Sequence, residues 1–511
     1  MFSTKSTLKK VLAAILAMTF ILASVSLLTA CGGKSDTTTD VGTFDSLTTT
    51  EEIIPPEVMD RTFNDYTFKV LIANRSGKTP NDFDASEPET AMGAAAYRRN
   101  EIMKTKYGII VDFEMDIGAG GAKPLHKGYE KVELQTTTKT NNYDLAVINT
   151  YTAAPLTTAN MLYDLNSIPH LDLSKAWWDK TVVDGITING SIYFVSGDIT
   201  TTVDDYMYCT IFNKKLYEKY AEDSVEDLYA LVDEGKWTLD ELGKRTTLIG
   251  DPDKAEGAET NDIINGGDVF GLMTWHDELY ACIQADGSGI ATLTEDGKIK
   301  MTLNTERNYK IMEKYLKIAA HETTLNFQNN AEGQEMFGYS WVKAFSGDRV
   351  MFFMTNLNEL NNFRNMETDY GILPNPKYEA DRDWYTTFVA GLAAFVCVPG
   401  YVEDIERTGI VTELLGYHAL ETIKPGYYTK TLTGLYCTDE ESTNSLTIIL
   451  DNKHVDIGHY FKIGGLNTAL YQVSQSDTPS TFASKWEAAQ DKVITDVTAI
   501  NKQFSALGKT E

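Results

Sequence analysis

The sequence predicts an α/β fold with a parallel sheet, because strand-like and helix-like segments alternate along the first third of the folded part. Strands are expected in three short apolar runs, residues 66–73, 109–115 and 143–148. Helices are expected between them, over residues 90–107 and 129–139. This alternation is typical of parallel sheets with helices on their faces.

Polar side chains follow two of these strands at the points where the strands end. Residues 74–76 (Asn-Arg-Ser) follow the first strand, and residues 149–152 (Asn-Thr-Tyr-Thr) follow the third. Ligands bind outside the carboxyl ends of the strands in open α/β sheets. Both segments are therefore expected at a binding site.

The N-terminus has the features of an export signal. Three lysines precede an apolar stretch, residues 11–28, and Leu28-Thr-Ala-Cys31 follows. This last segment resembles the lipobox of bacterial lipoproteins, which implies a signal peptide over residues 1–30 and a lipid on Cys31. The alternative is an uncleaved anchor helix over the apolar stretch. Both interpretations place the rest of the chain on the extracellular face of the cytoplasmic membrane.

A polar tether is expected after the lipid anchor, over residues 31–59. This stretch is rich in Thr, Ser and Asp and contains Pro55-Pro56. Such a composition offers little apolar surface to a core. The folded domains are therefore expected to begin near Asp60.

Length and charge limit the classes of partner. The chain has 511 residues, of which 42% are hydrophobic, which is enough for two or three packed domains. Its formal net charge is -28. An acidic surface repels nucleic acids and anionic lipid headgroups, so both are excluded as electrostatic partners.

The remaining cysteines do not form a metal motif. Cys209, Cys282, Cys397 and Cys437 include no CxxC pair and no Cys/His cluster with zinc spacing. Cys209 and Cys397 lie in apolar, strand-like runs. Buried free thiols are the favoured interpretation, and a disulfide is the alternative.

Six segments in order carry a resemblance to a known family. They are residues 162–166, 188–194, 212–214, 235–242, 347–353 and 370–374. Together they resemble the family 1 extracellular solute-binding proteins of ABC importers, which include maltodextrin-binding proteins. The resemblance implies a periplasmic-binding-protein-like fold of two α/β lobes joined by hinge crossovers, with the ligand in the cleft between them.

The resemblance also implies lobe boundaries. The first lobe is expected to contain residues 60–208 and 346–390, and the second lobe residues 209–345 and 391–511. The chain is expected to cross to the second lobe near residues 205–212, to return to the first near 348–373, and to cross again near 387–399. Helices such as 402–420 would complete the second lobe.

A sugar site needs amide or carboxylate partners for hydroxyls and aromatic faces for C–H surfaces. Nine residues of these types fall at positions that the end-of-strand rule or the resemblance places at the cleft. The candidates are Asn149, Tyr151, Asp205, Tyr206, Trp275, Asp277, Asn356, Trp384 and Tyr385. Each aromatic candidate has a core or surface position as its alternative.

The resulting hypothesis is a monomeric extracellular binding protein that captures a small solute, most simply a mono- or oligosaccharide, and delivers it to ABC permease subunits. One alternative is a surface polysaccharide-binding adhesin or sensor accessory. Another is an importer protein for a non-sugar solute such as a peptide.

Catalysis is not expected. The sequence has no Gly-x-Ser-x-Gly elbow, His-Glu-x-x-His pair or Walker-type loop, and its seven histidines are scattered. No cofactor or metal is predicted. Residues 251–268 are acidic but lack the glycine spacing and final glutamate of a calcium loop, so a flexible acidic loop is favoured.

Overall fold

A computed structural model gives the arrangement of residues 53–73, 82–116, 128–250, 268–326, 340–382, 384–475 and 480–507. The expected signal peptide, Cys31, most of the tether, the polar segment 74–76 and nearly all of the acidic segment 251–268 lie outside these described residues. Across the described residues, no helix combines the length and the apolar character that a bilayer-spanning helix needs.

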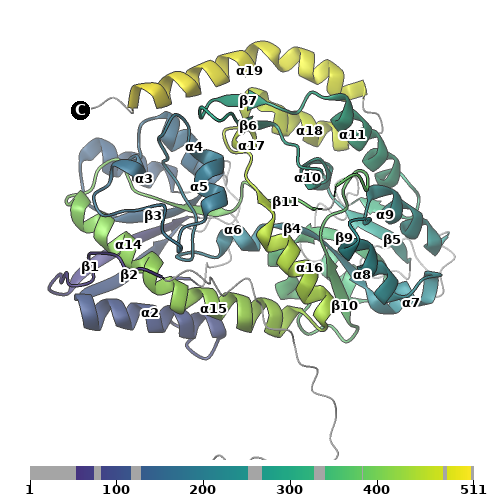
Figure 1. Cartoon of the computed structure of the whole chain (residues 1–511), viewed down its shortest axis with the longest axis horizontal. Helices are drawn as coiled ribbons and strands as arrows, with labels where there is room; N and C mark the ends of the chain where they lie inside the picture. Colours follow the sequence, from purple (N-terminus) through teal and green to yellow (C-terminus); the bar gives the residue numbers. More distant parts are fainter. Residues whose placement is uncertain are drawn as a thin grey trace, which may run out of the picture. The chain divides into compact units, whose positions relative to one another are not determined.

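The first lobe is built on a four-stranded sheet with the strand order β12-β3-β1-β2 (Figure 1). Its strands are β1 (Tyr66–Ala73), β2 (Ile109–Met115), β3 (Leu145–Asn149) and β12 (Ala394–Cys397). β1 runs parallel to β2 and β3, whereas β12 is antiparallel to β3. The predicted parallel α/β arrangement is confirmed for this part of the chain.

Seven helices of the described chain accompany this sheet, and the first two, α2 and α3, lie where the sequence predicts them. They are α2 (Ala91–Tyr107), α3 (Tyr129–Thr138), α4 (Thr150–Thr158), α5 (Lys180–Ile186), α6 (Thr202–Asp205), α14 (Ile405–Glu421) and α15 (Ile423–Tyr427). Helix α2 begins at Thr90, whose side chain accepts a hydrogen bond from the Gly93 amide. It ends at Gly108, which has a φ of 63°. A left-handed residue at this position favours glycine and fixes the turn into β2.

The second lobe is built on a five-stranded mixed sheet with the order β10-β4-β9-β5-β8. Its strands are β4 (Tyr208–Asn213), β5 (Phe270–Thr274), β8 (Thr324–Asn326), β9 (Val350–Asn356) and β10 (Tyr370–Leu373). Its helices are α7 (Lys214–Tyr220), α8 (Val225–Asp233), α9 (Leu239–Thr246), α10 (Asp277–Ala285), α11 (Glu306–Ala319), α13 (Ser340–Ser346), α16 (Glu440–Asp451) and α18 (Leu466–Ser474). Helix α9 is capped by Thr238, whose side chain accepts a hydrogen bond from the Glu241 amide.

Short elements and one long helix complete the described chain. The short strands form two pairs, β6 (Ala291–Leu293) with β7 (Ile299–Met301), and β11 (Thr387–Phe388) with β13 (Lys453–His454). The remaining helical elements are η3 (Leu165–Ser167), η4 (Thr247–Ile249), η7 (Leu357–Asn362), η8 (Tyr428–Tyr436), α17 (Ile457–Tyr460), η9 (Ile463–Gly465) and α19 (Ser480–Leu507).

Helix α19 contacts both lobes. Near its start, Phe482 lies 5.4 Å from the Tyr309 ring of α11. Near its end, Phe504 lies 5.2 Å from the Tyr193 ring, and the Gln503 amide donates to the carbonyl oxygens of Thr157 and Thr158 at the end of α4. The last helix therefore connects the lobes at a place remote from the hinge.

The hinge consists of two chain segments side by side. Residues between α6 and β4 form the first crossing, where Met207 makes an antiparallel bridge with Val389. The Ala390 amide donates to the Tyr206 carbonyl over 3.0 Å. The second crossing therefore lies between β11 and β12, inside the predicted range 387–399.

The expected return to the first lobe near residues 348–373 is wrong. Strand β9 pairs with β4 and β5, and β10 pairs with β4, so both strands belong to the second sheet. All seven residues of β9 are buried. A fully buried apolar strand fits the centre of either sheet, so its own sequence does not determine which sheet receives it.

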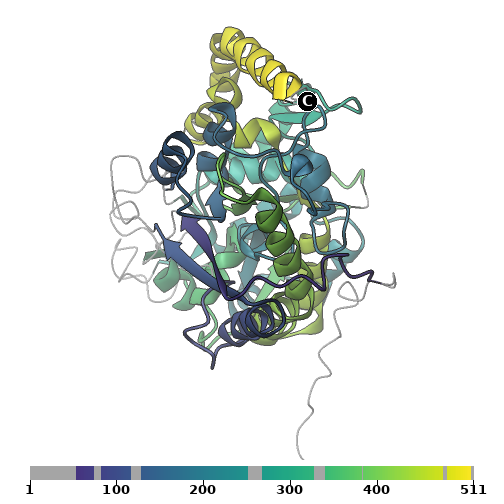
Figure 2. The same cartoon turned by 90° about the vertical axis from the view of Figure 1, so that its left-hand side faces the viewer.

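The assignment of residues 402–420 to the second lobe is also wrong. Helix α14 packs on α2 of the first lobe, which is visible in the view of that lobe in Figure 2. The Tyr107 hydroxyl lies 2.8 Å from Nε2 of His418, and the Trp178 indole nitrogen donates to Glu413 over 3.0 Å. In contrast, α16 lies against β10, where Ser442 Oγ accepts from the Ile372 amide.

The expected start of the folded part at Asp60 also needs correction. Pro56 and Val58 are buried, and Val58 is 4% exposed. A cavity of about 420 Å³ borders these residues and residues 170–175 of the first lobe. The end of the expected tether therefore packs on the first lobe.

A chain that starts at Asp60 is expected to be less stable than one that starts at Ile53. Burying a valine side chain contributes about 1.5–3 kcal/mol, so the loss in the free energy of unfolding is expected in that range. Urea unfolding of the two chains measures it. Equal midpoints would contradict the contribution of Val58.

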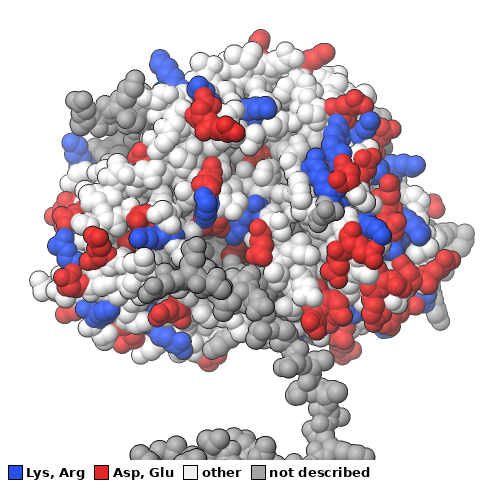
Figure 3. Space-filling model, in the orientation of Figure 1, with Lys and Arg blue, Asp and Glu red and all other residues white. Residues whose placement is uncertain are grey.

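Charged groups are unevenly distributed over the surface. Figure 3 shows acidic side chains gathered on the face where α8 and α16 lie. These helices contribute Glu226, Asp227, Asp233, Glu440 and Glu441. The acidic character predicted from composition is therefore concentrated on the second lobe in this view.

Candidate functional site

The first-lobe side of the candidate site is formed by the junction between β3 and α4. Asn149 ends the strand and lies at the N-cap of the helix, but its side chain makes no capping hydrogen bond. The side chain is fully buried, and within the described part of the chain neither its amide oxygen nor its amide nitrogen has a hydrogen-bond partner. Because buried amides are nearly always paired, this one is suited to a bound polar molecule.

The second-lobe side is formed by the junction between β5 and α10. Trp275 and His276 follow the strand, and Asp277 begins the helix. The Tyr208 hydroxyl of β4 donates to Oδ2 of Asp277 over 3.0 Å. The Asp277 side chain remains 43% exposed, so its carboxylate is accessible.

His459 and Lys462 lie between these two junctions. Nε2 of His459 is 3.5 Å from the Tyr151 hydroxyl, and Nζ of Lys462 lies 4.2 Å from the centre of the Tyr151 ring. His459 also stacks on Tyr280 at 5.1 Å. The C-terminal segment around α17 and η9 therefore places charged and aromatic groups beside the first-lobe tyrosine.

Burial dominates the electrostatics of these groups. Burial lowers the pKa of His459 to about 4, although the nearby charges of Asp456 and Asp277 oppose this shift. Burial raises the pKa of Tyr208 well above its ordinary value, and the negative charge of Asp277 raises it further. At neutral pH, His459 is therefore an uncharged ring and Tyr208 a neutral hydroxyl, both able to form hydrogen bonds.

We call Asn149, Tyr151, Tyr208, Asp277 and His459 the interlobe cluster. It combines an amide, two phenol hydroxyls, a carboxylate and an imidazole from both lobes. Aromatic side chains pack beside the cluster and form an aromatic wall. The ring centres of Trp275 and Trp341 are 4.7 Å apart, and those of Tyr208 and Phe388 are 4.8 Å apart. These groups can form hydrogen bonds with hydroxyls and cover an apolar face.

Among the other predicted site residues, Asn356 and Trp275 lie next to Tyr208 of this cluster, whereas Asp205 and Tyr206 lie at the hinge. Asn356 ends β9 opposite Tyr208 in the strand register, is 5% exposed, and has no partner for Oδ1 among the described residues. Asp205 accepts a hydrogen bond from the Tyr427 hydroxyl over 2.7 Å, and Tyr206 belongs to the hinge crossing. Trp275 is 5% exposed, so it supports the wall of the site more than it presents an open platform.

Trp384 and Tyr385 do not join the interlobe cluster. Tyr385 is 2% exposed and its hydroxyl accepts from the Trp237 amide, which makes it a core residue of the second lobe. Trp384 is 46% exposed and lies against Gly287, just beyond the C-terminal end of α10, whereas Asp277 begins that helix. The expectation that this pair lines the same site is therefore not supported by its position.

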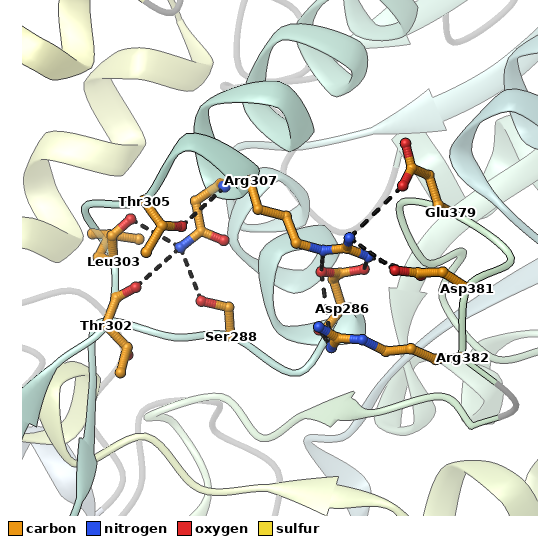
Figure 4. Close-up of polar contacts among 10 residues, drawn as sticks. Asp286, Ser288, Thr302, Leu303, Thr305, Arg307, Glu379, Asp381 and Arg382 are labelled. Atoms are coloured by element: carbon orange, nitrogen blue, oxygen red, sulfur yellow. Dashed lines mark hydrogen bonds and ion pairs between the residues drawn. The ribbon is translucent and has the colours of Figure 1, made fainter.

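Ion pairs hold the loop of Trp384 in this position (Figure 4). Arg307 binds Asp286 on one side and Asp381 on the other, with 2.9 Å from Nη2 to Oδ1 of Asp381. Arg382 stacks on Trp384 at 5.1 Å and donates to the Asp286 carbonyl. This network fixes the loop against α10 and α11.

Sequence reasoning missed three residues of the site. Tyr208 was included in an apolar strand, although its spacing of two from Tyr206 is a strand period that could have marked it. His459 is one of seven scattered histidines, and its local sequence carries no motif that marks it. No sequence feature marks Lys462 as a site residue, because its position beside Tyr151 depends on contacts between segments more than 300 residues apart.

The described residues contain no group of three or more His, Cys, Asp or Glu side chains arranged to hold a metal ion. In the same part of the chain Cys209, Cys282, Cys397 and Cys437 are free thiols, and the first three are buried. The favoured interpretation of these cysteines is therefore confirmed.

Solved structures with a similar two-lobe fold include substrate-binding and maltodextrin-binding proteins. A cyclo/maltodextrin-binding protein complexed with maltotetraose is similar with a TM-score of 0.55, 14% identity, and coverage of 85% of this chain and 98% of that one. An ABC substrate-binding protein from Listeria monocytogenes in complex with cycloalternan has a TM-score of 0.53, 13% identity, and coverage of 84% and 99%.

A third solved structure shares the fold but was determined with a different kind of ligand. UgpB from Mycobacterium tuberculosis in complex with glycerophosphocholine has a TM-score of 0.51, 13% identity, and coverage of 82% of this chain and 100% of that one. No family sequence profile and no curated protein matches the chain. At these identities the likeness confirms the predicted two-lobe α/β fold.

Proposed function

We propose that this protein is the extracellular substrate-binding component of an ABC importer and that it binds a mono- or oligosaccharide at the interlobe cluster. It acts without catalysis and delivers the solute to permease subunits. The single observation that carries the proposal is the buried Asn149 amide, which has no partner in the described part of the chain. A sugar hydroxyl can both donate to and accept from such an amide.

The other groups of the cluster suit the same ligand. The exposed carboxylate of Asp277 and the hydroxyl of Tyr151 can bind ring hydroxyls, while Tyr151 and the aromatic wall offer surfaces to C–H faces. The proteins of similar fold that are complexed with maltotetraose and cycloalternan support a saccharide as the solute class. Closure of two hinged lobes would sequester the solute before delivery.

The proposed cellular location of the protein rests on the N-terminal sequence. Residues 28–31 form a lipobox-like sequence, so we propose that Cys31 carries a lipid and that the chain acts as a monomer on the outer face of the cytoplasmic membrane. A lipid anchor on a polar tether keeps the binding lobes near the permease while leaving them accessible to solute.

Thermal melting with a panel of ligands tests the proposal. Maltose, maltotetraose and a cyclodextrin represent saccharides, and glycerophosphocholine represents a phosphorylated polar solute. At a ligand concentration of 100 times Kd, binding to the folded state stabilises it by about 2.7 kcal/mol. We expect at least one saccharide to raise the melting temperature in this way.

The other outcomes distinguish the alternatives. A shift with glycerophosphocholine alone would replace the sugar by a charged solute, for which Lys462 beside Tyr151 would be the natural contact. Retention on insoluble polysaccharide without any effect of the small saccharides would favour an adhesin.

A further inference from the structure

A polar cavity of about 180 Å³ lies outside the interlobe cluster and shares none of its residues. The first lobe contributes the start of α5 and the segment that leads into α6. Lys424 of α15, Tyr428 at the start of η8 and Lys453 of β13 also line the cavity. The residues that matter for the argument are Trp178, Asp179, Asp198, Asp204, Lys424 and Lys453.

The charges around this cavity do not cancel. Three carboxylates and two ammonium groups line it, which leaves one excess negative charge. Nζ of Lys453 binds Oδ2 of Asp179 at 2.6 Å and Oδ1 of Asp204 at 2.8 Å. Lys424 is the remaining lysine, and its Nζ lies 3.4 Å from Oδ1 of Asp198. The excess negative charge therefore belongs to Asp179 and Asp204, which share Lys453, while Asp198 has only the longer ion pair with Lys424.

Asp198 is short of hydrogen-bond donors. Its side chain is only 14% exposed, and Oδ2 has no partner among the described residues. Burial raises the pKa of this carboxyl to about 6, against the effect of the Lys424 charge. A buried carboxylate with one long ion pair is unfavourable unless a further donor or positive charge approaches it.

We propose that this cavity binds a small organic cation with a primary ammonium group, held by Asp198 and covered by the aromatic side chains of Trp178 and Tyr428. The volume corresponds to about six water molecules at liquid density, which suits a small molecule. An ammonium group supplies three donors and one positive charge, and aromatic faces attract cations. This site is independent of the solute site proposed above.

Titration of the whole chain with ethylammonium chloride, without any sugar, tests the inference. Sodium chloride at equal ionic strength and ethanol at equal concentration control for screening and for the apolar part of the probe. Because Trp178 lines the cavity, we expect a saturable change in tryptophan fluorescence and a rise in melting temperature with ethylammonium alone.

Asp198→Asn keeps the shape of the side chain and removes its charge, so we expect it to weaken ethylammonium binding by about tenfold or more. The matched control is Asp184→Asn, which removes an equal charge from a 62% exposed side chain of α5 and should leave binding unchanged. Equal binding by the parent and Asp198→Asn, or no saturable effect in the parent, would overturn the proposal.

Ala176→Leu provides a second, independent test. Ala176 lines the cavity, and the larger side chain would occupy its volume while every charge is retained. We expect this variant to lose the ethylammonium effect and to remain folded. If Asp198→Asn does not fold, full binding by Ala176→Leu would overturn the proposal by itself.

Discussion

Replacing Lys453 by methionine is expected to lower the free energy of unfolding by about 3–5 kcal/mol. The Lys453 side chain is 12% exposed and binds both Asp179 and Asp204. Burial lowers the pKa of Lys453, but the charges of Asp204 and Asp179 outweigh burial and hold the pKa above its ordinary value. Removing the ammonium group leaves two buried carboxylates without compensation, which is the costly way to break a buried ion pair.

Urea unfolding followed by circular dichroism measures this loss. Lys492→Met is the matched control, because Lys492 is 59% exposed and pairs with Asp496 one helical turn away, where the expected change is about 0.5 kcal/mol or less. Adding Asp204→Asn to Lys453→Met should recover part of the lost stability. Similar losses for Lys453→Met and Lys492→Met would show that the buried ion pairs do not hold the lobe together.

Replacing Asn149 by leucine is expected to weaken solute binding by roughly ten- to hundredfold. A solute group that loses its partner in a buried site costs about 1–3 kcal/mol, and 1.4 kcal/mol is tenfold in affinity. The empty protein should be as stable as the parent or more stable, since leucine has a similar volume and removes an unpaired buried amide. Calorimetric titration with the saccharide found by melting, together with urea unfolding, measures both effects.

Asn308→Leu is the control for this pair of effects. The Asn308 side chain is 1% exposed, and its amide nitrogen donates to Ser288 Oγ and to the carbonyl oxygens of Thr302 and Leu303 (Figure 4). Its replacement should lower stability by about 1–3 kcal/mol and leave affinity unchanged. If Asn149→Leu instead loses stability and keeps affinity, Asn149 is structural and the proposed solute site is wrong.

The sequence was informative wherever the signal was local. Apolar runs and helix caps located β1, β2 and α2 within one residue of their ends, because strand burial and N-cap chemistry depend on a few neighbouring side chains. The end-of-strand rule selected Asn149, Tyr151 and Asn356, which the structure places at or beside the interlobe cluster. Whether these residues bind a solute stays a prediction.

Predictions from the sequence were wrong where a segment could pack equally well on either lobe. Strand β9 is apolar on both faces and fits the interior of either sheet, so the lobe that receives it depends on its hydrogen-bonded neighbours β4 and β5. The sequence of helix α14 is compatible with packing on either lobe. Its contacts with α2 and with Trp178 place it on the first lobe. Tyr385 is an aromatic residue of the type that lines sugar sites, but the structure places it in the core of the second lobe.

By itself, then, the sequence determined the α/β class, the first strands and helices of the first lobe and the acidic character of the surface, since each depends on residue type and short spacing. Only the tertiary structure showed to which lobe residues 346–421 belong and where Pro56 and Val58 pack. It also showed that His459 and Lys462 lie beside Tyr151. These features arise from contacts between residues hundreds of positions apart, and such contacts are selected by the burial and hydrogen bonding of the whole chain, which no single segment encodes.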